Sequence, residues 1–183
     1  MALAKDRSRI SVRGGGDLRV RPLKPTPNDT WLVLGYQGGT TIDDGYSMVE
    51  CVDEKGLLIE YLDGQEIVKV TGKLMQSTID EINHLKVVGT LWEMYYCVKL
   101  ANGNYQEYSF PLTRFSFGPT LAMEANKLRD IPFETRCLAV KAAMTRTPTA
   151  FNIAVDQAYV LTENAAAQNP PSDTATSVVA ALY

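Results

Sequence analysis

The side chains able to do chemistry are few in this sequence, and their spacing matches none of the familiar catalytic motifs. His84 is the only histidine among 183 residues, so a multi-histidine metal site is excluded and any Ser-His-Asp or Cys-His arrangement would depend on it. The glycine clusters at 14–16 and 35–39 match neither the phosphate-binding loop nor the dinucleotide-binding fingerprint. Turn and linker roles for the glycines, and a helix position for His84, are the better interpretations. The chain is therefore not expected to be an enzyme.

Acidic side chains gather in the stretch 26–66, which holds nine Asp or Glu against Lys55 alone. The members best placed to bind a hard cation are Asp43, Asp44, Asp53 and Glu54. Their spacing differs from that of the EF-hand loop and they straddle a predicted strand. Nothing singles out a pair of carboxylates for glycoside hydrolysis. We interpret the cluster as a solvated acidic face and expect neither a metal nor a cofactor.

The three cysteines, Cys51, Cys97 and Cys137, are widely spaced and flanked by apolar residues. An odd number with such spacing suggests neither a disulfide framework nor a zinc cluster. Buried free thiols are the expected state, and whether any of the three joins subunits by a disulfide stays open.

The composition fits one soluble domain with a proper core. Hydrophobic residues make up 45% of the chain, and no composition break demands a second domain. No stretch approaches the roughly 20 apolar residues that cross a bilayer, and the N-terminus lacks the apolar centre of a secretion signal. We expect a chain made in the cytoplasm that does not enter a membrane.

The two ends differ in composition from the middle. Residues 1–25 hold seven Lys or Arg against two Asp, and prolines follow at positions 22, 25 and 27. This composition predicts a basic, extended N-terminal arm over 1–29. Its charges are expected to serve solubility or to dock on an acidic neighbour, more than to bind nucleic acid or membrane phosphates. Residues 164–176 have a linker composition, and the last seven residues are apolar. The domain is therefore expected over 30–163, with a C-terminal linker and apolar tail over 164–183.

The sequence pattern in the middle of the chain predicts about eight strands. The strongest pattern is a hairpin in which the run 91–100 returns as 105–112 around Asn102, Gly103 and Asn104. A second hairpin is expected around 53–55, and an Asp63-Gly64 pair predicts another turn. The other expected strands are 31–36, 67–74, 115–118, 131–140 and 151–161, while 121–128 favours neither helix nor strand.

One short helix interrupts this pattern, at about 77–87. Thr78 and Glu81 form a Thr-x-x-Glu capping box, and Ile79, Ile82 and Leu85 make an apolar stripe. A helix of this length is marginal alone, so it must pack across a sheet or against another chain. The fold class predicted is mainly β, a β-sandwich or half-barrel with one flanking helix and extended arms.

The order of these parts resembles the tail tube proteins of long-tailed bacteriophages. The resemblance covers about residues 45–140, and it is carried by the helix within a strand-rich domain and by the Ile131-Pro132-Phe133-Glu134 run near the last core strand. It implies a virion protein of the phage tail, made in the bacterial cytoplasm. It further implies hexameric rings that stack into a tube, contact other tail proteins and let double-stranded DNA pass without specific binding.

Two sets of residues follow from this hypothesis. An acidic lumen wall would repel phosphates and keep a duplex mobile. Its expected residues are Asp43, Asp44, Glu50, Asp53 and Glu54. The expected subunit contacts are Arg13, Arg19, Arg21, Asp80, Glu81 and Lys86. Ring closure would also protect open sheet edges.

Three alternatives remain at this level. The first is another virion protein, namely a tail terminator, a distal tail protein or a head-to-tail connector. The second is a carbohydrate-binding sandwich with Trp92, Tyr95 and Tyr96 as an aromatic platform. The third is an enzyme whose site shows no motif, which a pocket with strongly shifted carboxylates would support.

Overall fold

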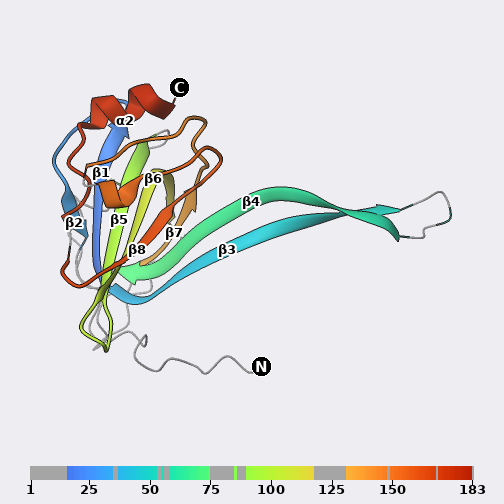
Figure 1. The fold of residues 1–183 in the computed structure, drawn as a ribbon, viewed down its shortest axis with the longest axis horizontal. Helices are drawn as coiled ribbons and strands as arrows, with labels where there is room; N and C mark the ends of the chain where they lie inside the picture. Colours follow the sequence, from blue (N-terminus) through green and yellow to red (C-terminus); the bar gives the residue numbers. More distant parts are fainter. Residues whose placement is uncertain are drawn as a thin grey trace.

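A computed structural model of the chain describes residues 16–34, 37–52, 55, 58–74, 85, 90–117, 131–147, 149–167 and 169–182. The architecture is mainly β, as predicted: the described strands form one antiparallel, eight-stranded sheet, in keeping with a β-sandwich or half-barrel. From the sheet body, one long two-stranded ribbon projects to the side (Figure 1).

The strands follow one another through most of the described residues, and, apart from the helical residue Leu85, two short helical segments come late among them. The strands are β1 (Asp17–Lys24), β2 (Leu32–Leu34), β3 (Gln37–Val52), β4 (Leu58–Leu74), β5 (Leu91–Lys99), β6 (Tyr105–Phe117), β7 (Ile131–Cys137) and β8 (Val160–Asn164). The helical segments are the 3-10 turn η2 (Thr149–Phe151) and the α-helix α2 (Ala175–Leu182).

The strand order is β2-β1-β5-β6-β7-β4-β3, with β8 paired to β6 beside this path. β6 is the branch point, because its first half bonds to β8 and its second half to β7. Tyr105–Ser109 pair with Asn164–Val160, and Thr113–Phe117 pair with Cys137–Phe133. β7 and β8 therefore follow one another along the same edge of β6, and β4 continues past the end of β7.

Both faces of the central strands are buried. Trp92 and Met94 of β5 belong to the main apolar cluster, together with Phe110 and Phe133. Glu93 and Tyr95, which alternate with Trp92 and Met94 along β5, point to the opposite face because strand side chains alternate. There Tyr95 is 1% exposed and Glu93 is 0% exposed. That second face is covered by Val140, Met144, Phe151 and Ile153 and by Ala175 and Val178 of α2.

The β5–β6 hairpin confirms the strongest local prediction. Leu100 and Asn104 close the turn through a backbone hydrogen bond of 2.7 Å, and the Asn102 side chain accepts from the Asn104 N–H at 2.9 Å. Gly103 has a φ of 89°, a left-handed conformation that L side chains rarely adopt. The turn residues alone therefore explain where this hairpin folds back.

The β3–β4 hairpin was predicted at its tip but not at its length. β3 has 16 residues and β4 has 17, and the two pair from Gln37↔Leu74 to Val52↔Leu58. The turn predicted at Asp63-Gly64 is wrong, because both residues lie within β4. The register shifts between Tyr46 and Met48, opposite this pair, so the glycine marks a β-bulge and not a reversal.

The ends of the domain also differ from the expectation. Asp17–Lys24, predicted as part of an arm, form β1 between β2 and β5, with Leu18 and Val20 both 0% exposed. Ala175–Leu182, predicted as an apolar tail, form α2, whose Ala175 and Val178 are buried. The apolar residues at both ends thus bury themselves in this chain's own core.

Two other predictions have mixed outcomes. The strand predicted over 151–161 is limited to its end, since β8 begins at Val160 and η2 occupies Thr149–Phe151. The helix predicted over about 77–87 lies outside the described residues except for Leu85. Leu85 has helical backbone, is 2% exposed and belongs to the main apolar cluster, as its place in the predicted stripe requires.

Candidate assembly interface

The distal ribbon, defined here as Gly45–Val52 of β3 and Leu58–Ile67 of β4, is the part of the described chain with least internal support. β4 bonds to β7 only from Val68 to Leu74, so beyond Val68 each ribbon strand has only the other as its strand partner among the described residues. At about 3.3 Å per residue the ribbon extends about 30 Å. Figure 1 shows it leaving the body in a single direction.

The sequence of the distal ribbon is not that of a purely solvated hairpin. Its apolar residues include Met48, Val49, Val52, Leu58, Ile59 and Leu62. An isolated two-stranded hairpin is at best marginally stable in water, and an apolar one invites pairing with another chain. Length, isolation and composition together mark the ribbon as the candidate interface.

The ribbon is fixed to the body where it leaves the sheet. The hydroxyl of Tyr159 donates to Asp44 Oδ2 at 2.6 Å. Tyr159 in turn packs against Tyr108 and Phe110, with ring centroids 6.3 Å and 5.6 Å away. Gly72 lies so close to the Phe133 ring that an added Cβ would sit 2.9 Å from it. The base of the ribbon is therefore held by direct contacts, which give its projection a defined direction.

On the covered face of the sheet, the body is held by a buried ionic network. Arg21 Nε donates to Glu93 Oε2 at 2.6 Å, and Arg146 Nη2 donates to Glu93 Oε1. Arg21, Glu93 and Arg146 are each 1% exposed or less. Arg146 Nε also bonds Asp173 Oδ2 at 2.9 Å. Two guanidinium and two carboxylate groups thus balance in charge, which is the condition for burying them.

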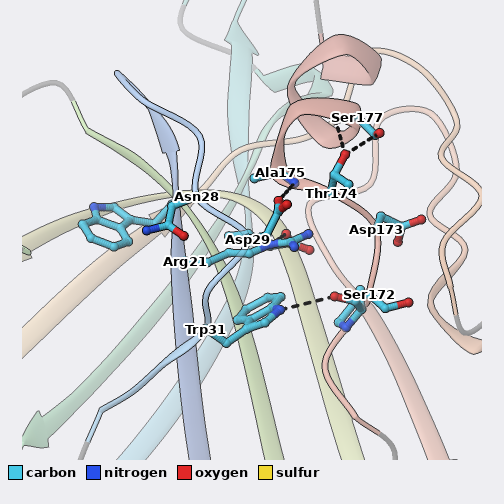
Figure 2. A network of polar contacts seen from close by, with 12 residues as sticks. Arg21, Asn28, Asp29, Trp31, Ser172, Asp173, Thr174, Ala175 and Ser177 are labelled. Carbon is cyan, nitrogen blue, oxygen red and sulfur yellow. Dashed lines mark hydrogen bonds and ion pairs between the residues drawn. The ribbon is translucent and has the colours of Figure 1, made fainter.

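The same network attaches the C-terminal segment to β1 and to the residues between β1 and β2 (Figure 2). The Trp31 indole N–H donates to the Pro171 carbonyl at 3.3 Å, and the Arg21 guanidinium stacks 4.7 Å from the Trp31 ring centroid. The Ala175 N–H, at the first turn of α2, donates to Asp29 Oδ1 at 2.6 Å. The Thr174 hydroxyl accepts from the Ser177 N–H at 3.1 Å as an N-cap.

Asp173 is the partly exposed member of the network. Burial by itself would raise the pKa of its carboxyl group, but the Thr147 N–H and the Arg146 guanidinium outweigh burial and lower the pKa below its ordinary value. The charged form is therefore the one that holds the segment before α2 against Arg146.

A second buried carboxylate fixes β8. Tyr95 donates its hydroxyl to Glu107 Oε1 at 2.6 Å, and the Asn164 amide donates to Glu107 Oε2 at 2.7 Å. Burial raises the pKa of the Tyr95 hydroxyl, and the bond to Glu107 raises it further. Burial also raises the pKa of the Cys97 thiol beside them to about 11. Both groups stay protonated at neutral pH and act as donors.

The thiol prediction is confirmed for two cysteines. Cys97 and Cys137 are buried and free. Burial raises the pKa of the Cys137 thiol to about 12, so neither is reactive at neutral pH. The side chain of Cys51, in the distal ribbon, lies outside the described residues.

Two of the predicted lumen residues can be placed. Asp43 and Asp44 are exposed on β3 near the base of the ribbon, and Asp43 pairs in register with Lys69. The Glu50 side chain, Asp53 and Glu54 lie outside the described residues. Both are therefore open to solvent, but as neighbours in one strand they point to opposite faces.

The predicted subunit contacts separate into three outcomes. Arg19 is half-buried and bonds Asp17 through its Nε at 2.8 Å. Arg21 needs a correction, because it is 1% exposed and neutralises Glu93 within the core. The remaining four, Arg13, Asp80, Glu81 and Lys86, lie outside the described residues. The aromatic platform also needs a correction, since Trp92 and Tyr95 are each 1% exposed.

The sequence did contain one signal for the ionic network. Glu93 stands within the apolar run 91–98, where a carboxylate is buried only if a cation joins it. Its partners could not be identified, because Arg21 and Arg146 lie 72 and 53 residues away.

Within the described ranges, no group of three or more His, Cys, Asp or Glu side chains is arranged to hold a metal ion. The helices found in those same ranges are too short or too polar to span a bilayer.

Comparison with known proteins finds likeness in structure and not in sequence. No protein-family model matches the chain, and no curated protein matches its sequence. A chain of the structure described as the cryo-EM structure of the anti-feeding prophage baseplate, six-fold symmetrised, is similar with a TM-score of 0.39 and 11% identity. The match covers 74% of this chain and 93% of that chain. At this degree of likeness, function has to be argued from the chain's own geometry.

Proposed function

We propose that this chain is a structural subunit of a phage-type tail tube, which forms hexameric rings that stack around a channel for double-stranded DNA. The observation that carries the proposal is the distal ribbon, which extends about 30 Å from the body with no third strand among the described residues. A ribbon of this length becomes stable when a neighbouring subunit covers it. Assembly is thus the function that its geometry serves.

The two edges of the sheet support the same proposal. β2 and β3 stand at the opposite ends of the strand order, and Val33 of β2 is 56% exposed. Unpaired edges attract other strands, and a head-to-tail contact that closes into a ring removes them. A chain whose two end strands each have one strand partner among the described residues is suited to such a contact.

The acidic base of the ribbon supports a channel that does not hold DNA. Asp43 and Asp44 are exposed there, on opposite faces of β3, and Asp44 is the one held by Tyr159. In the proposed ring Asp43 lines the lumen with Glu50, Asp53 and Glu54. Like charge repels phosphates, so a duplex would pass without specific binding. In this proposal other tail proteins bind the two ends of the tube, and the mature protein resides in the virion.

Electron microscopy of the purified chain tests the proposal. The wild type is compared with a variant in which residues 46–66 are replaced by Asn-Gly, and with Lys141→Ala, an exposed change in the body, as control. We expect tubes or six-fold rings from the wild type and the control. The shortened variant should give monomers whose melting temperature lies within a few degrees of the wild type, because the ribbon adds little to the body.

Two outcomes would contradict the proposal. A wild-type chain that stays monomeric at high concentration would contradict self-assembly. Tubes formed by the shortened variant would show that the ribbon is not needed for assembly. Single rings that never stack would favour the second candidate, a tail terminator, distal tail or head-to-tail connector protein, which shares ring closure but not tube growth.

A further inference from the structure

β8 offers an open strand edge next to the base of the ribbon. It bonds to β6 on one side, and no other strand pairs with it among the described residues. Its side chains alternate, with Val160, Thr162 and Asn164 half-buried and Leu161 and Glu163 exposed. Leu161 is 45% exposed. An edge of this kind is a template for one more strand.

Two carboxylates stand at the ends of this exposed edge. Asp44 is held at one end by the Tyr159 hydroxyl, and Glu163 lies at the other, four positions after Tyr159. At the Asp44 end, a hollow of about 350 Å³ is lined by Asp44 and by residues 157–161. In extended chain, four positions correspond to about 13 Å. A strand that fits here should carry two cations at that spacing.

The chain itself contains such a strand in the segment before β1. Residues 9–13 read Arg-Ile-Ser-Val-Arg, with arginines four positions apart and two β-branched residues between them. Alternation places Arg9, Ser11 and Arg13 on one face and Ile10 and Val12 on the other. The pattern complements β8 on both faces.

We propose that residues 9–13 of one subunit add to the β8 edge of a second copy as an antiparallel strand. In this register Arg9 faces Glu163, Ser11 faces Leu161, and Arg13 reaches Asp44 at Tyr159. Ile10 and Val12 then lie beside Thr162 and Val160. The inference rests on the proposed function, because it names the contact that joins neighbouring subunits.

The reach of the chain assigns the strand to a second copy. Asp17, Cys97, Glu107 and Thr162 form one row across β1, β5, β6 and β8. With strands about 4.8 Å apart, a strand added outside β8 lies about 19 Å from β1. The four residues from Arg13 to Asp17 span at most about 14 Å. A subunit's own Arg13 therefore cannot reach this edge in the proposed register.

Disulfide trapping tests the register of the added strand and whether it comes from a second copy of the chain. Ser11→Cys and Leu161→Cys are made in separate full-length chains that also carry Cys51→Ser, then mixed, allowed to assemble and mildly oxidised. We expect a covalent dimer on a non-reducing gel, because directly opposed residues have Cβ atoms about 5 Å apart. Thr162→Cys in place of Leu161→Cys is the matched control, since its side chain points to the other face.

Two gel results would overturn the proposal. One is equal cross-linking of the Thr162 control. The other is a double variant, Ser11→Cys with Leu161→Cys in one chain, that closes only within itself and stays monomer-sized after oxidation.

Charge reversal separates this contact from the proposed function. Arg9→Glu with Arg13→Glu should weaken association on the order of tenfold, whereas the same positions changed to Lys should not. Adding Asp44→Arg and Glu163→Arg should restore association. If the wild type assembles and the Glu variant assembles equally well, only the docking is wrong. If no chain assembles, the proposed function itself fails.

Discussion

The covered face of the sheet, at β1 and β5, and the distal ribbon of β3 and β4 belong to one sheet but have opposite surroundings. On the covered face Glu93 is 0% exposed, two arginines neutralise it, and the C-terminal segment closes over it. In the ribbon each strand has one neighbour among the described residues. The body is thus completed by its own chain, while the ribbon is left for another.

This difference has an energetic cause. Burying apolar surface contributes about 25 cal/mol per Å², and a strand with both faces covered obtains that contribution twice. A ribbon in water gains little burial against the entropy of ordering its residues. Changes in the body should therefore act on folding, and changes in the ribbon on assembly.

The largest effect is expected from Glu93→Gln. This change leaves Arg21 and Arg146 buried without their shared counterion, and such a loss costs about 3–5 kcal/mol of the free energy of unfolding. Urea denaturation of the monomer measures it. The control is Glu134→Gln, whose partner Arg136 is 67% exposed and which should cost under about 1 kcal/mol. Equal costs would mean that the network does not hold the body.

A smaller effect is expected from Thr174→Ala. The change removes the acceptor for the Ser177 N–H at the start of α2 and should cost about 1 kcal/mol. Thr174→Ser, which keeps the hydroxyl, is the control. Hydrogen exchange should show faster opening confined to α2, and an unchanged α2 would show that other contacts alone hold the helix.

The contribution of Asp173 should depend on pH. Since the folded pKa lies below the unfolded value, its stabilisation is present above about pH 4 and is lost as the pH falls through the folded pKa. The difference in unfolding free energy between wild type and Asp173→Asn should shrink below pH 4. A difference that stays constant from pH 7 to pH 3 would contradict the ionic role.

The smallest effect on the monomer is expected from Val49→Ser, opposite Leu62 in the distal ribbon. It should change the free energy of unfolding by less than about 0.5 kcal/mol. The same change should reduce tube formation, measured by light scattering. A large loss of monomer stability would show that the ribbon is part of the folding unit, which would erase the contrast with the body.

Local sequence features predicted local structure well. Asn102-Gly103-Asn104 was sufficient to place the β5–β6 hairpin, because Gly103 meets its φ of 89° without strain. The pattern around 53–55 also placed the reversal between β3 and β4. By contrast, Asp63-Gly64 has the same turn chemistry and lies inside a strand, because pairing with β3 continues on both sides of the bulge.

For the candidate interface, the sequence supplied the acidic stretch and the basic segment before β1, but not their positions. The fold brings Asp44 beside Tyr159, 115 residues away, and so places a carboxylate at the edge of β8. It also removes Arg21 from the set of surface contacts, because Glu93 on the neighbouring strand needs a cation. Contacts between residues so far apart leave no periodic trace in the sequence.

The sequence by itself determined a mainly β chain, free buried thiols at Cys97 and Cys137, and a basic N-terminal stretch followed by an acidic one. These features depend on residue type and short-range alternation. Only the tertiary structure decided that β1 and α2 belong to the body and that β3 and β4 run on beyond it. The physical reason is that burial and strand pairing depend on contacts between segments that are far apart in the sequence. Residue types and short-range alternation do not specify which segments make these contacts.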